Sequence, residues 1–523
     1  MAEEKTASSP SPPSSPSSLP PSALCPPPSD DEAYLRSLGY AQQLFREMGG
    51  FSNFAVSFSI ISVLTGAILL YGYGLKFGGP IVQSVGWPIV SFFTLAVAAS
   101  MAEIASAYPT AGGLYYWSFR LGGRGWAWMT AWLNMLGQVT ITAGINIAAA
   151  IYLIGAFFPS VHATWGLQLL VMIAITIPQV VINIYGIRVS ALLTDLSVWW
   201  HIAGVAIITL SLIFLGTHHN PLSFLFTFQP SVDAASLEKV AIGDFTFDSP
   251  LFPLLKPFYF TMPMLFVLGL LQAQWTYTGY DASAHVAEET RMARLNSAWG
   301  IFLSVAVSAV VGYVMLMALT WCIPNGDVRA TAADPYPVLF IVAHNLPALL
   351  AKLIAVIIGV AMWLCGLASI TSMGRMWYAF ARDDGMPMSR YLKRISGTHH
   401  VPAVAIVVTS ILAIVMCVYA AAFYVVTSIS TIALYLAYVI PIFLNLRNRM
   451  RRRGISMTAD LAPWSLGRFG SAINAIAIVW CAFIAIVFLL PPNELVLWTM
   501  VALSMFLGVY WFALRRRTFT GPL

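Results

Sequence analysis

The sequence predicts an all-α membrane protein with twelve transmembrane helices. Of its 523 residues, 59% are hydrophobic and only 9% are charged, whereas about a quarter of the residues of a soluble domain are charged. Mean hydropathy is +0.78. Apolar stretches of about 20 residues, enough to cross the hydrocarbon of a bilayer, recur along almost the whole chain after residue 50. These stretches are unbroken rather than alternating, which indicates helices and not the strands of a membrane barrel.

The twelve expected spans leave no room for a soluble domain between them. In chain order we place them at about residues 52–75, 82–107, 126–157, 165–185, 190–215, 258–287, 297–322, 351–381, 401–419, 421–446, 470–490 and 494–514.

The basic residues predict that both ends of the chain are cytoplasmic. With that orientation, all but five of the 27 Lys and Arg residues fall in cytoplasmic segments, as the positive-inside rule requires. The same rule accounts for the net charge of +6 without a nucleic-acid partner, because basic loops lie beside anionic lipid. The five exceptions are Lys76, Lys239, Lys256, Arg329 and Lys352.

The first 34 residues differ from the rest in composition. They contain ASSPSPPSSPSSLPPSALCPPPS, which is too rich in Pro and Ser to pack a core, so we expect residues 1–34 to be a disordered cytoplasmic tail. The twelve-helix domain then covers 35–515, and 516–523 form a short cytoplasmic end. The five cysteines are scattered without a CxxC pair, so neither a disulfide framework nor a metal site is predicted, and no cofactor is expected.

Spans 1 and 6 each contain a Thr-Gly dipeptide. Thr65 and Gly66 interrupt the first span, and Thr278 and Gly279 interrupt the sixth, where Asp281 follows. A helix broken within the bilayer exposes N–H groups at one new end and C=O groups at the other, and a polar substrate can satisfy them. A single glycine more often permits close helix packing. A matched pair in two halves of the chain instead indicates a transporter site at the midplane.

Three stretches resemble motifs of the amino acid–polyamine–organocation transporters. Residues 277–290, YTGYDASAHVAEET, are similar to the family's sixth-helix signature. Residues 101–117, MAEIASAYPTAGGLYYW, resemble the inner end of its helix 2, and residues 372–387, SMGRMWYAFARDDGMP, resemble the segment that closes its helix 8. The resemblance covers roughly residues 35–515. It is greatest to the amino acid/choline subgroup, which includes GABA permeases, choline permeases and plant bidirectional amino acid transporters.

The resemblance implies two inverted five-helix repeats, at about 52–215 and 258–446, whose first helices (1 and 6) are broken, plus two C-terminal helices at about 470–514. It also implies alternating access to a central site for amino acids or related amines, such as GABA and neutral or cationic amino acids. A choline or polyamine permease is the alternative. We expect an integral protein of the lipid bilayer, in the plasma membrane.

The family binds a substrate carboxylate at the break of helix 1, where its Gly-Ser-Gly-Ile pattern falls here on Thr65, Gly66, Ala67 and Ile68. The change to Thr and Ala leaves less space beside the backbone. In helix 6, carbonyls would bind an ammonium, and the ring of Trp275 could add a cation–π attraction of about 0.5–2 kcal/mol. Asp281 matches the family's acid and should pair or cap the restarted helix. The expected substrate-binding residues are Thr65, Gly66, Ala67, Ile68, Trp275, Tyr277, Thr278, Gly279 and Asp281.

Two candidates exist for ion coupling. His201 falls where proton-coupled relatives carry a Lys, and a histidine exchanges protons near physiological pH. Ala368, Thr371 and Ser372 instead resemble the A-x-x-T-S sodium site of sodium-coupled relatives. There are other interpretations. His201 could be a hydrogen-bonded core histidine, the hydroxyls of Thr371 and Ser372 could bond to carbonyls of the preceding helical turn, and the protein could exchange substrates without an ion.

Charged residues of the three motifs predict a gate near the cytoplasmic face, because an ionic network there could close one state and break in the other. Solvated surface positions are the alternative. Gln138 and Asn146 are candidates for the cavity wall, although bonding between helices is the commoner use, and His285 could pair with Asp281. The expected gate residues are Glu103, Glu288, Glu289, Arg375 and Arg382, with Asp383 and Asp384 beside them.

Other functional classes lack sequence support. The chain has no HExxH, GxSxG or P-loop motif, which disfavours a membrane enzyme or an ATP-driven pump. No repeated pore loop indicates a channel.

Overall fold

The computed structural model describes residues 29–158, 160–185, 187–232, 238–242, 245–259, 261–420, 423–451, 458, 461–491 and 493–522. Most of the predicted tail therefore lies outside the described residues. Its last six positions differ from the expectation of disorder, because helix α1 begins at Ser29 and runs to Ser37.

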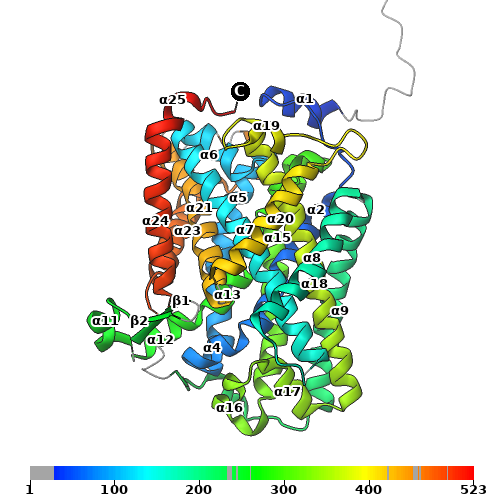
Figure 1. Cartoon of the computed structure of the whole chain (residues 1–523), viewed down its shortest axis with the longest axis vertical. Coiled ribbons are helices and arrows are strands. Elements are labelled where there is room, and N and C mark those ends of the chain that lie inside the picture. Colours follow the sequence, from blue (N-terminus) through cyan, green and yellow to red (C-terminus); the bar gives the residue numbers. More distant parts are fainter. Residues whose placement is uncertain are drawn as a thin grey trace, which may run out of the picture.

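Helices form almost all of the described structure (Figure 1). The first half contains α2 (Gly50–Ile61), α3 (Gly66–Leu69), α4 (Tyr71–Gly78), α5 (Trp87–Ala107), α6 (Leu114–Gly122), α7 (Arg124–Phe157), α8 (Trp165–Tyr185) and α9 (Ile187–Leu215). The second half contains α11 (Phe252–Tyr259), α12 (Met262–Gly269), α13 (Leu271–Thr276), α14 (Ala282–His285), α15 (Ala293–Trp321), α16 (Val328–Ala333), α17 (Pro337–Asn345), α18 (Ala348–Arg382), α19 (Ser389–Leu392), α20 (Ala403–Ala420) and α21 (Phe423–Arg451). The C-terminal helices are α23 (Gly470–Val487), α24 (Glu494–Tyr510) and α25 (Arg516–Thr518).

Ten helices in the described part of the chain are long and apolar enough to cross a membrane. These helices confirm the prediction of an all-α membrane domain. The other two expected spans correspond to the broken segment from Met262 to His285 and to the shorter helix α20, so a total of twelve spans stays a prediction.

The start of the expected sixth span, at about residue 258, falls in a separate short helix. Helix α11 bends away from α12 by 113°, and α12 begins at Met262. The reason is local: Thr261 is extended and a proline occupies the first turn of α12, which favours a helix start there. A second departure from the all-helical expectation lies just upstream, where β1 (Lys239–Ile242) and β2 (Phe245–Asp248) form an antiparallel hairpin.

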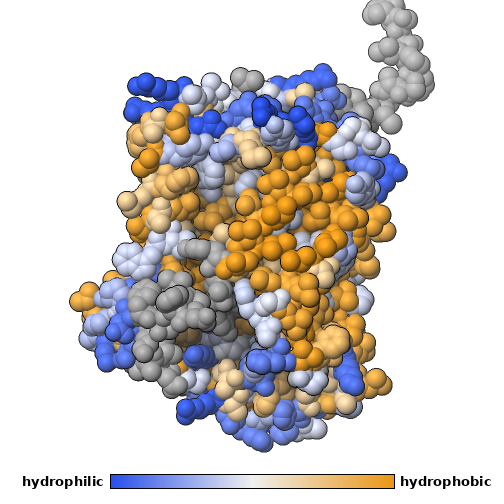
Figure 2. Space-filling view, in the orientation of Figure 1, coloured by the Kyte–Doolittle hydropathy of each residue, from blue (hydrophilic) through white to orange (hydrophobic). Residues whose placement is uncertain are grey.

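Both ends of the described chain lie on one face of the molecule, which carries α1 and α25 (Figure 1). We call it the termini face. The opposite face carries α16, α17 and the β1–β2 hairpin. Between the two faces, Figure 2 shows a broad hydrophobic surface, which is most extensive on the right of the view. Apolar side chains on the outer helices are exposed, as expected of residues that contact lipid: Phe214 of α9 is 75% exposed and Val509 of α24 is 69% exposed.

The two longest helices, α7 and α18, run through the interior. Helix α7 packs against both α18 and α21, while α14 is enclosed by α2, α15 and α18. Small residues permit these approaches: a Cβ atom at Gly137 of α7 would lie 2.6 Å from Leu434 of α21. Close helix packing through small residues is typical of membrane bundles. The central helices thus surround the two broken segments.

Candidate functional site

A small cavity lies between the two helix breaks. Its volume is about 10 Å³, room for about one water molecule, and none of the residues that line it is charged. Both interrupted segments contribute to its wall, together with α7. The lining residues are Ile60, Ile61, Thr65, Gly66, Ile141, Ile145, Trp275, Thr276 and Thr278.

The break in the first span begins at Ser62, whose φ of +32° ends helix α2. The chain resumes a helical conformation at Gly66, where α3 starts. The first N–H groups of a helix have no acceptor within the helix. Among the described residues, the N–H groups of Ala67 and Ile68 donate to no backbone or side-chain acceptor. This break therefore presents donors within the bilayer.

The break in the sixth span is built around Gly279. Its φ of +86° lies in the region that L side chains rarely adopt, and it separates α13 from α14. The carbonyls of Thr276 and Thr278 accept no backbone hydrogen bond in the described structure. This second break therefore presents acceptors. The predicted interruptions of both helices are confirmed.

The breaks are also in direct contact with each other. A Cβ atom at Gly66 would lie 2.8 Å from the Cα atom of Thr276, so the two backbones approach too closely for any larger residue. The side-chain amide of Gln272 donates to the carbonyl of Ala67 over 3.0 Å. Gln272 in turn accepts a 2.6 Å hydrogen bond from Gln83. These amides hold the two interrupted segments together.

The two aromatic residues predicted for the site lie differently. Trp275 lines the cavity, and its indole N–H donates to Ser430 over 3.1 Å. Tyr277 turns away toward α5, where its hydroxyl lies 2.6 Å from Ser91 and its ring packs on Trp87. Only the indole is thus available to a bound molecule.

Asp281 does not line the cavity and makes no capping bond to α14. Its buried carboxylate is surrounded by donors. Oδ2 accepts from Asn134 (2.9 Å), Gln138 (3.0 Å) and His285 (3.1 Å), while Oδ1 accepts from Tyr438 (2.8 Å). The predicted pair of Asp281 with His285 is thus present, and Gln138 serves this carboxylate. Asn146 bonds instead to Thr176 and Gln179 of α8, which is the commoner use of such a residue.

His201 is buried and connected to the break of the first span. Its Nδ1 lies 2.7 Å from the carbonyl of Ser197 and must donate there, so the neutral ring accepts at Nε2. The hydroxyl of Ser62 lies 2.6 Å from Nε2, and Thr65 lies 2.6 Å from Ser62. A short chain of hydrogen bonds therefore joins His201 to a residue of the cavity wall.

The A-x-x-T-S residues of α18 have different surroundings. Thr371 donates to Asn183 of α8 over 2.6 Å. The hydroxyl of Ser372 is buried without a partner among the described residues, and Ala368 is fully buried. Within those residues, no group of three or more His, Cys, Asp or Glu side chains is placed to hold a metal ion.

Two buried ion pairs follow the sixth span at the termini face. Arg375 meets Glu289 at 3.1 Å, and Arg382 makes a bidentate pair with Glu288 at 2.9 Å. Four of the five predicted gate residues thus come together. Glu103 does not join them: it pairs with Arg449 of α21 and accepts from the backbone N–H of Leu466.

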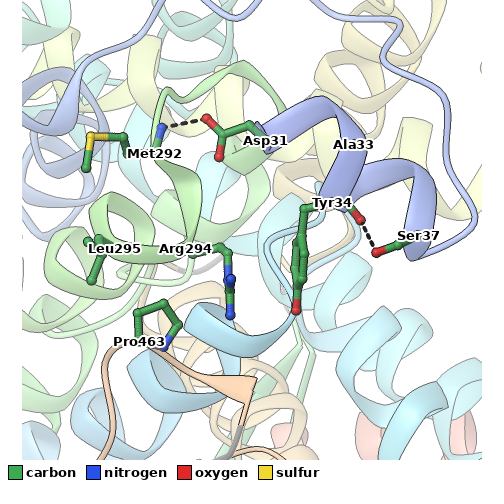
Figure 3. A pocket seen from close by; sticks show the side chains of 8 residues that line it. All are labelled: Asp31, Ala33, Tyr34, Ser37, Met292, Arg294, Leu295 and Pro463. Atoms are coloured by element: carbon green, nitrogen blue, oxygen red, sulfur yellow. Dashed lines mark hydrogen bonds between the residues drawn. The ribbon is translucent and has the colours of Figure 1, made fainter. Parts of the chain in front are cut away.

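The chain before α2, residues 29–48, crosses the same face; we call it the N-terminal segment. Asp31 accepts from the backbone N–H groups of Met292 and Ala293 at the start of α15, and Figure 3 shows Arg294 beside the ring of Tyr34, at 4.3 Å. Further along, Tyr40 donates to Asp383 over 2.6 Å. The segment therefore lies against the paired gate residues.

Several residues of this site escape prediction from the sequence. Tyr438 donates to Asp281 and accepts from the N–H of Gly279 over 3.1 Å, yet a tyrosine in an apolar helix usually indicates an interface anchor. Ser62, Asn134 and Gln272 are single polar residues within apolar runs. Their position close to a predicted break, or on a helix that faces one, is the signal in the sequence that could have identified them.

Comparisons with known proteins show the family of this chain. The family described as "Amino acid permease" matches residues 49–512. The chain belongs to this family. It is 33% identical to the Amino-acid permease BAT1 homolog of Oryza sativa and to Amino-acid permease BAT1 of Arabidopsis thaliana, each over 94% of this chain and 95% of the relative. It is also 28% identical to the GABA-specific permease of Saccharomyces cerevisiae, over 72% of this chain and 64% of the relative.

Family membership confirms the expected resemblance and the expectation of an amino acid transporter rather than an enzyme. The two broken helices that the resemblance implies are present in the structure, at α2–α3 and at α13–α14.

Proposed function

We propose that this amino acid permease carries a small amino acid with an uncharged side chain, and that the substrate spans the cavity between the two breaks. The observation that carries this proposal is the opposite polarity of the breaks. Unpaired N–H groups of Ala67 and Ile68 suit a carboxylate, and unpaired carbonyls of Thr276 and Thr278 suit an ammonium. Backbone groups at helix ends bind such ions without a charged side chain.

The rest of the wall favours an apolar or short side chain on the substrate. Ile60, Ile61, Ile141 and Ile145 line it together with Trp275. A cationic side chain would be buried there without an acidic partner, which is costly in a bilayer. Neutral amino acids and GABA therefore fit better than cationic amino acids, choline or polyamines, and one relative is named a GABA-specific permease.

Transport would proceed by alternating access. The Glu289–Arg375 and Glu288–Arg382 ion pairs, which lie at the termini face, support a closed gate there. We propose that this face is cytoplasmic and that these pairs break when the site opens to it. The expected location in the plasma membrane stays a proposal.

A proton is favoured over sodium as the coupling ion. Thr371 of the sodium motif donates to Asn183 of α8, and no hydrogen bond in the described structure joins this motif to the cavity wall, whereas His201 is joined to it. His201 could accept a proton at Nε2, and its bond to Ser62 would carry the change to Thr65 in the cavity wall. Protonation would convert that ring nitrogen from acceptor to donor.

Counterflow in liposomes tests the proposal. Purified protein is loaded with unlabelled GABA or a neutral amino acid, and uptake of the labelled compound is followed at equal pH on both sides. We expect saturable exchange, and we expect unlabelled GABA or an unlabelled neutral amino acid to reduce it by competition. If folded protein of verified orientation exchanged no amino acid, or exchanged lysine and choline better than neutral compounds, the proposed substrate class would be wrong.

A further inference from the structure

We propose that the Asp281–His285 pair is a buried proton-binding site, and that its proton is linked to closure of the termini face through Ala111. This inference rests on the proposed function, because it concerns the proton that would drive transport. In this inference the pair holds the coupling proton in place of His201, which lies on α9 beside the break of the first span.

The first step concerns the partners of the imidazole ring. Nδ1 of His285 lies 3.0 Å from the carbonyl oxygen of Ala111, and Nε2 lies 3.1 Å from Oδ2 of Asp281. A carbonyl can only accept, and so can an ionised carboxylate. A neutral imidazole has one N–H and can satisfy only one of the two contacts. Both contacts are satisfied only when the pair holds one proton more than a neutral histidine and a carboxylate.

The second step concerns where that proton resides. Oδ2 of Asp281 also accepts from the amides of Asn134 and Gln138, and Tyr438 donates to Oδ1. A protonated carboxyl oxygen would lose part of this capacity to accept. The arrangement therefore corresponds to an ionised Asp281 and a doubly protonated His285. A buried ion pair is stable only if its remaining polar atoms are also hydrogen-bonded. Here both oxygens of Asp281 and both ring nitrogens of His285 have partners.

The third step concerns other charges that could replace this proton. Helix α7 faces the pair with the neutral Asn134 and Gln138, and α21 faces it with the hydroxyl of Tyr438. Tyr280, next to Asp281, packs its ring on Tyr438.

Helices α2, α15 and α18 also pack against α14. Of these, α2 offers the neutral Asn53 and Ser57 to Ser283. The charged groups nearby are paired, Arg375 of α18 with Glu289 and Arg382 with Glu288. The proton of the pair is thus the group that balances the charge of Asp281.

The fourth step connects the pair to the gate. Ala111 lies in the turn between α5 and α6, and both its backbone carbonyl and its backbone N–H group make hydrogen bonds to side chains. Its carbonyl accepts from His285, and its N–H donates to Oε1 of Glu288 over 3.0 Å. Glu288 is the partner of Arg382. One residue therefore links the protonated ring to the ion pair that closes the termini face.

The pair is also linked to the cavity. The hydroxyl of Tyr438 accepts from the N–H of Gly279 and donates to Asp281, and Thr278 of the cavity wall precedes Gly279. If the gate opened and α14 moved away from Ala111, the Nδ1–H group of His285 would lose its acceptor. The proton would then leave to water, so that the imidazolium of His285 becomes a neutral imidazole while the carboxylate of Asp281 stays ionised. The pair as a whole changes from neutral to singly negative.

Uptake driven by a pH gradient tests this inference in proteoliposomes. With one proton carried per substrate, a gradient of one pH unit supports an accumulation ratio of about tenfold for a neutral substrate. We expect His285→Gln and Asp281→Asn to lower this ratio to about one while counterflow at equal pH persists. His344→Gln is the matched control, because His344 is an exposed histidine bonded only to the preceding turn of its own helix, and it should accumulate as the wild type does.

If the wild type showed no counterflow, the proposed function would be wrong. Different results would contradict the proton site. It is overturned if folded His285→Gln accumulates substrate as the wild type does, or if His201→Ala abolishes accumulation while both variants of the pair retain it. Should those two variants fail to fold, the wild type still decides: accumulation that ignores the pH gradient, with no uptake of protons reported by a pH dye, overturns the inference.

Discussion

Gly279 and Ile60 approach so closely that a Cβ atom at position 279 would lie 2.3 Å from Cγ2 of Ile60. The two residues belong to the sixth and first spans, so this contact is one of the places where the broken segments meet. Gly279 also has a φ of +86°. The absence of a side chain is therefore required twice, by the backbone conformation and by the neighbouring isoleucine.

Gly279→Ala is expected to abolish transport. The left-handed conformation alone costs an alanine about 1–2 kcal/mol, and relief of the clash would move the break that lines the cavity. Gly123→Ala is the matched control, because Gly123 has a φ of +88° with nothing within 4 Å of its Cβ position. Uptake and surface expression of both variants would be measured. Normal uptake by Gly279→Ala would contradict the role assigned to this break.

The sequence predicted the breaks but only part of what surrounds them. The Thr-Gly pairs located both interruptions, because the chain has few ways to leave a helix in lipid. The spacing of Asp281 and His285, one helical turn apart, also predicted the contact between these two residues. The sequence did not show that Asp281 is saturated by Asn134, Gln138 and Tyr438, since these residues lie on other helices and their facing depends on helix rotation.

Glu103 illustrates the same limit. Its motif and its depth suggested the gate, but its acceptor oxygens face Arg449 and the backbone at Leu466. A carboxylate near several arginines can pair with any of them, and only the packing of α5 against α21 decides which.

Glu288→Gln is expected to open the termini face more often. Removing one partner leaves Arg382, which is 12% exposed, with an uncompensated charge, and breaking a buried pair costs about 3–5 kcal/mol. The closed state would lose this stabilisation. The readout is labelling from the termini face of a single cysteine introduced at Thr278 in a cysteine-free background, which should become several-fold faster.

Asp384→Asn provides the control for that experiment. Asp384 pairs with Lys393 nearby, but it is 68% exposed, and exposed pairs contribute little. Its labelling rate should match the parent protein. Equal rates for Glu288→Gln and Asp384→Asn would show that the Glu288–Arg382 pair does not close this face.

Glu103→Gln is expected to reduce stability without affecting the gate. Glu103 is buried with Arg449 and also accepts from Ser465 and Leu466, so it joins α5, α21 and the chain before α23. Losing the carboxylate charge should lower the free energy of unfolding by about 3–5 kcal/mol. Thermal unfolding in detergent and the Thr278 cysteine assay would be compared. Faster labelling at an unchanged Tm would contradict this separation of roles.

Asp383 should make the docking of the N-terminal segment depend on pH. Burial raises the pKa of Asp383, and the nearby Arg382 lowers it less, while Tyr40 and Tyr115 donate to its Oδ2. A carboxyl with a raised pKa binds its proton more tightly when folded. Its stabilising contribution is therefore complete below the ordinary Asp pKa of about 3.9 and is lost as pH rises through the folded value.

Asp383→Asn is expected to be at least as stable as the wild type at neutral pH, because it removes a buried charge and can still accept from both tyrosines. As pH falls toward the ordinary Asp range, the wild-type carboxyl becomes neutral and the two proteins should converge. Thermal unfolding of both proteins across that pH range measures the difference in Tm. If the wild type were instead more stable than Asp383→Asn at neutral pH and lost that advantage on acidification, the ionised carboxylate, held by Arg382, would be the form that the folded state favours.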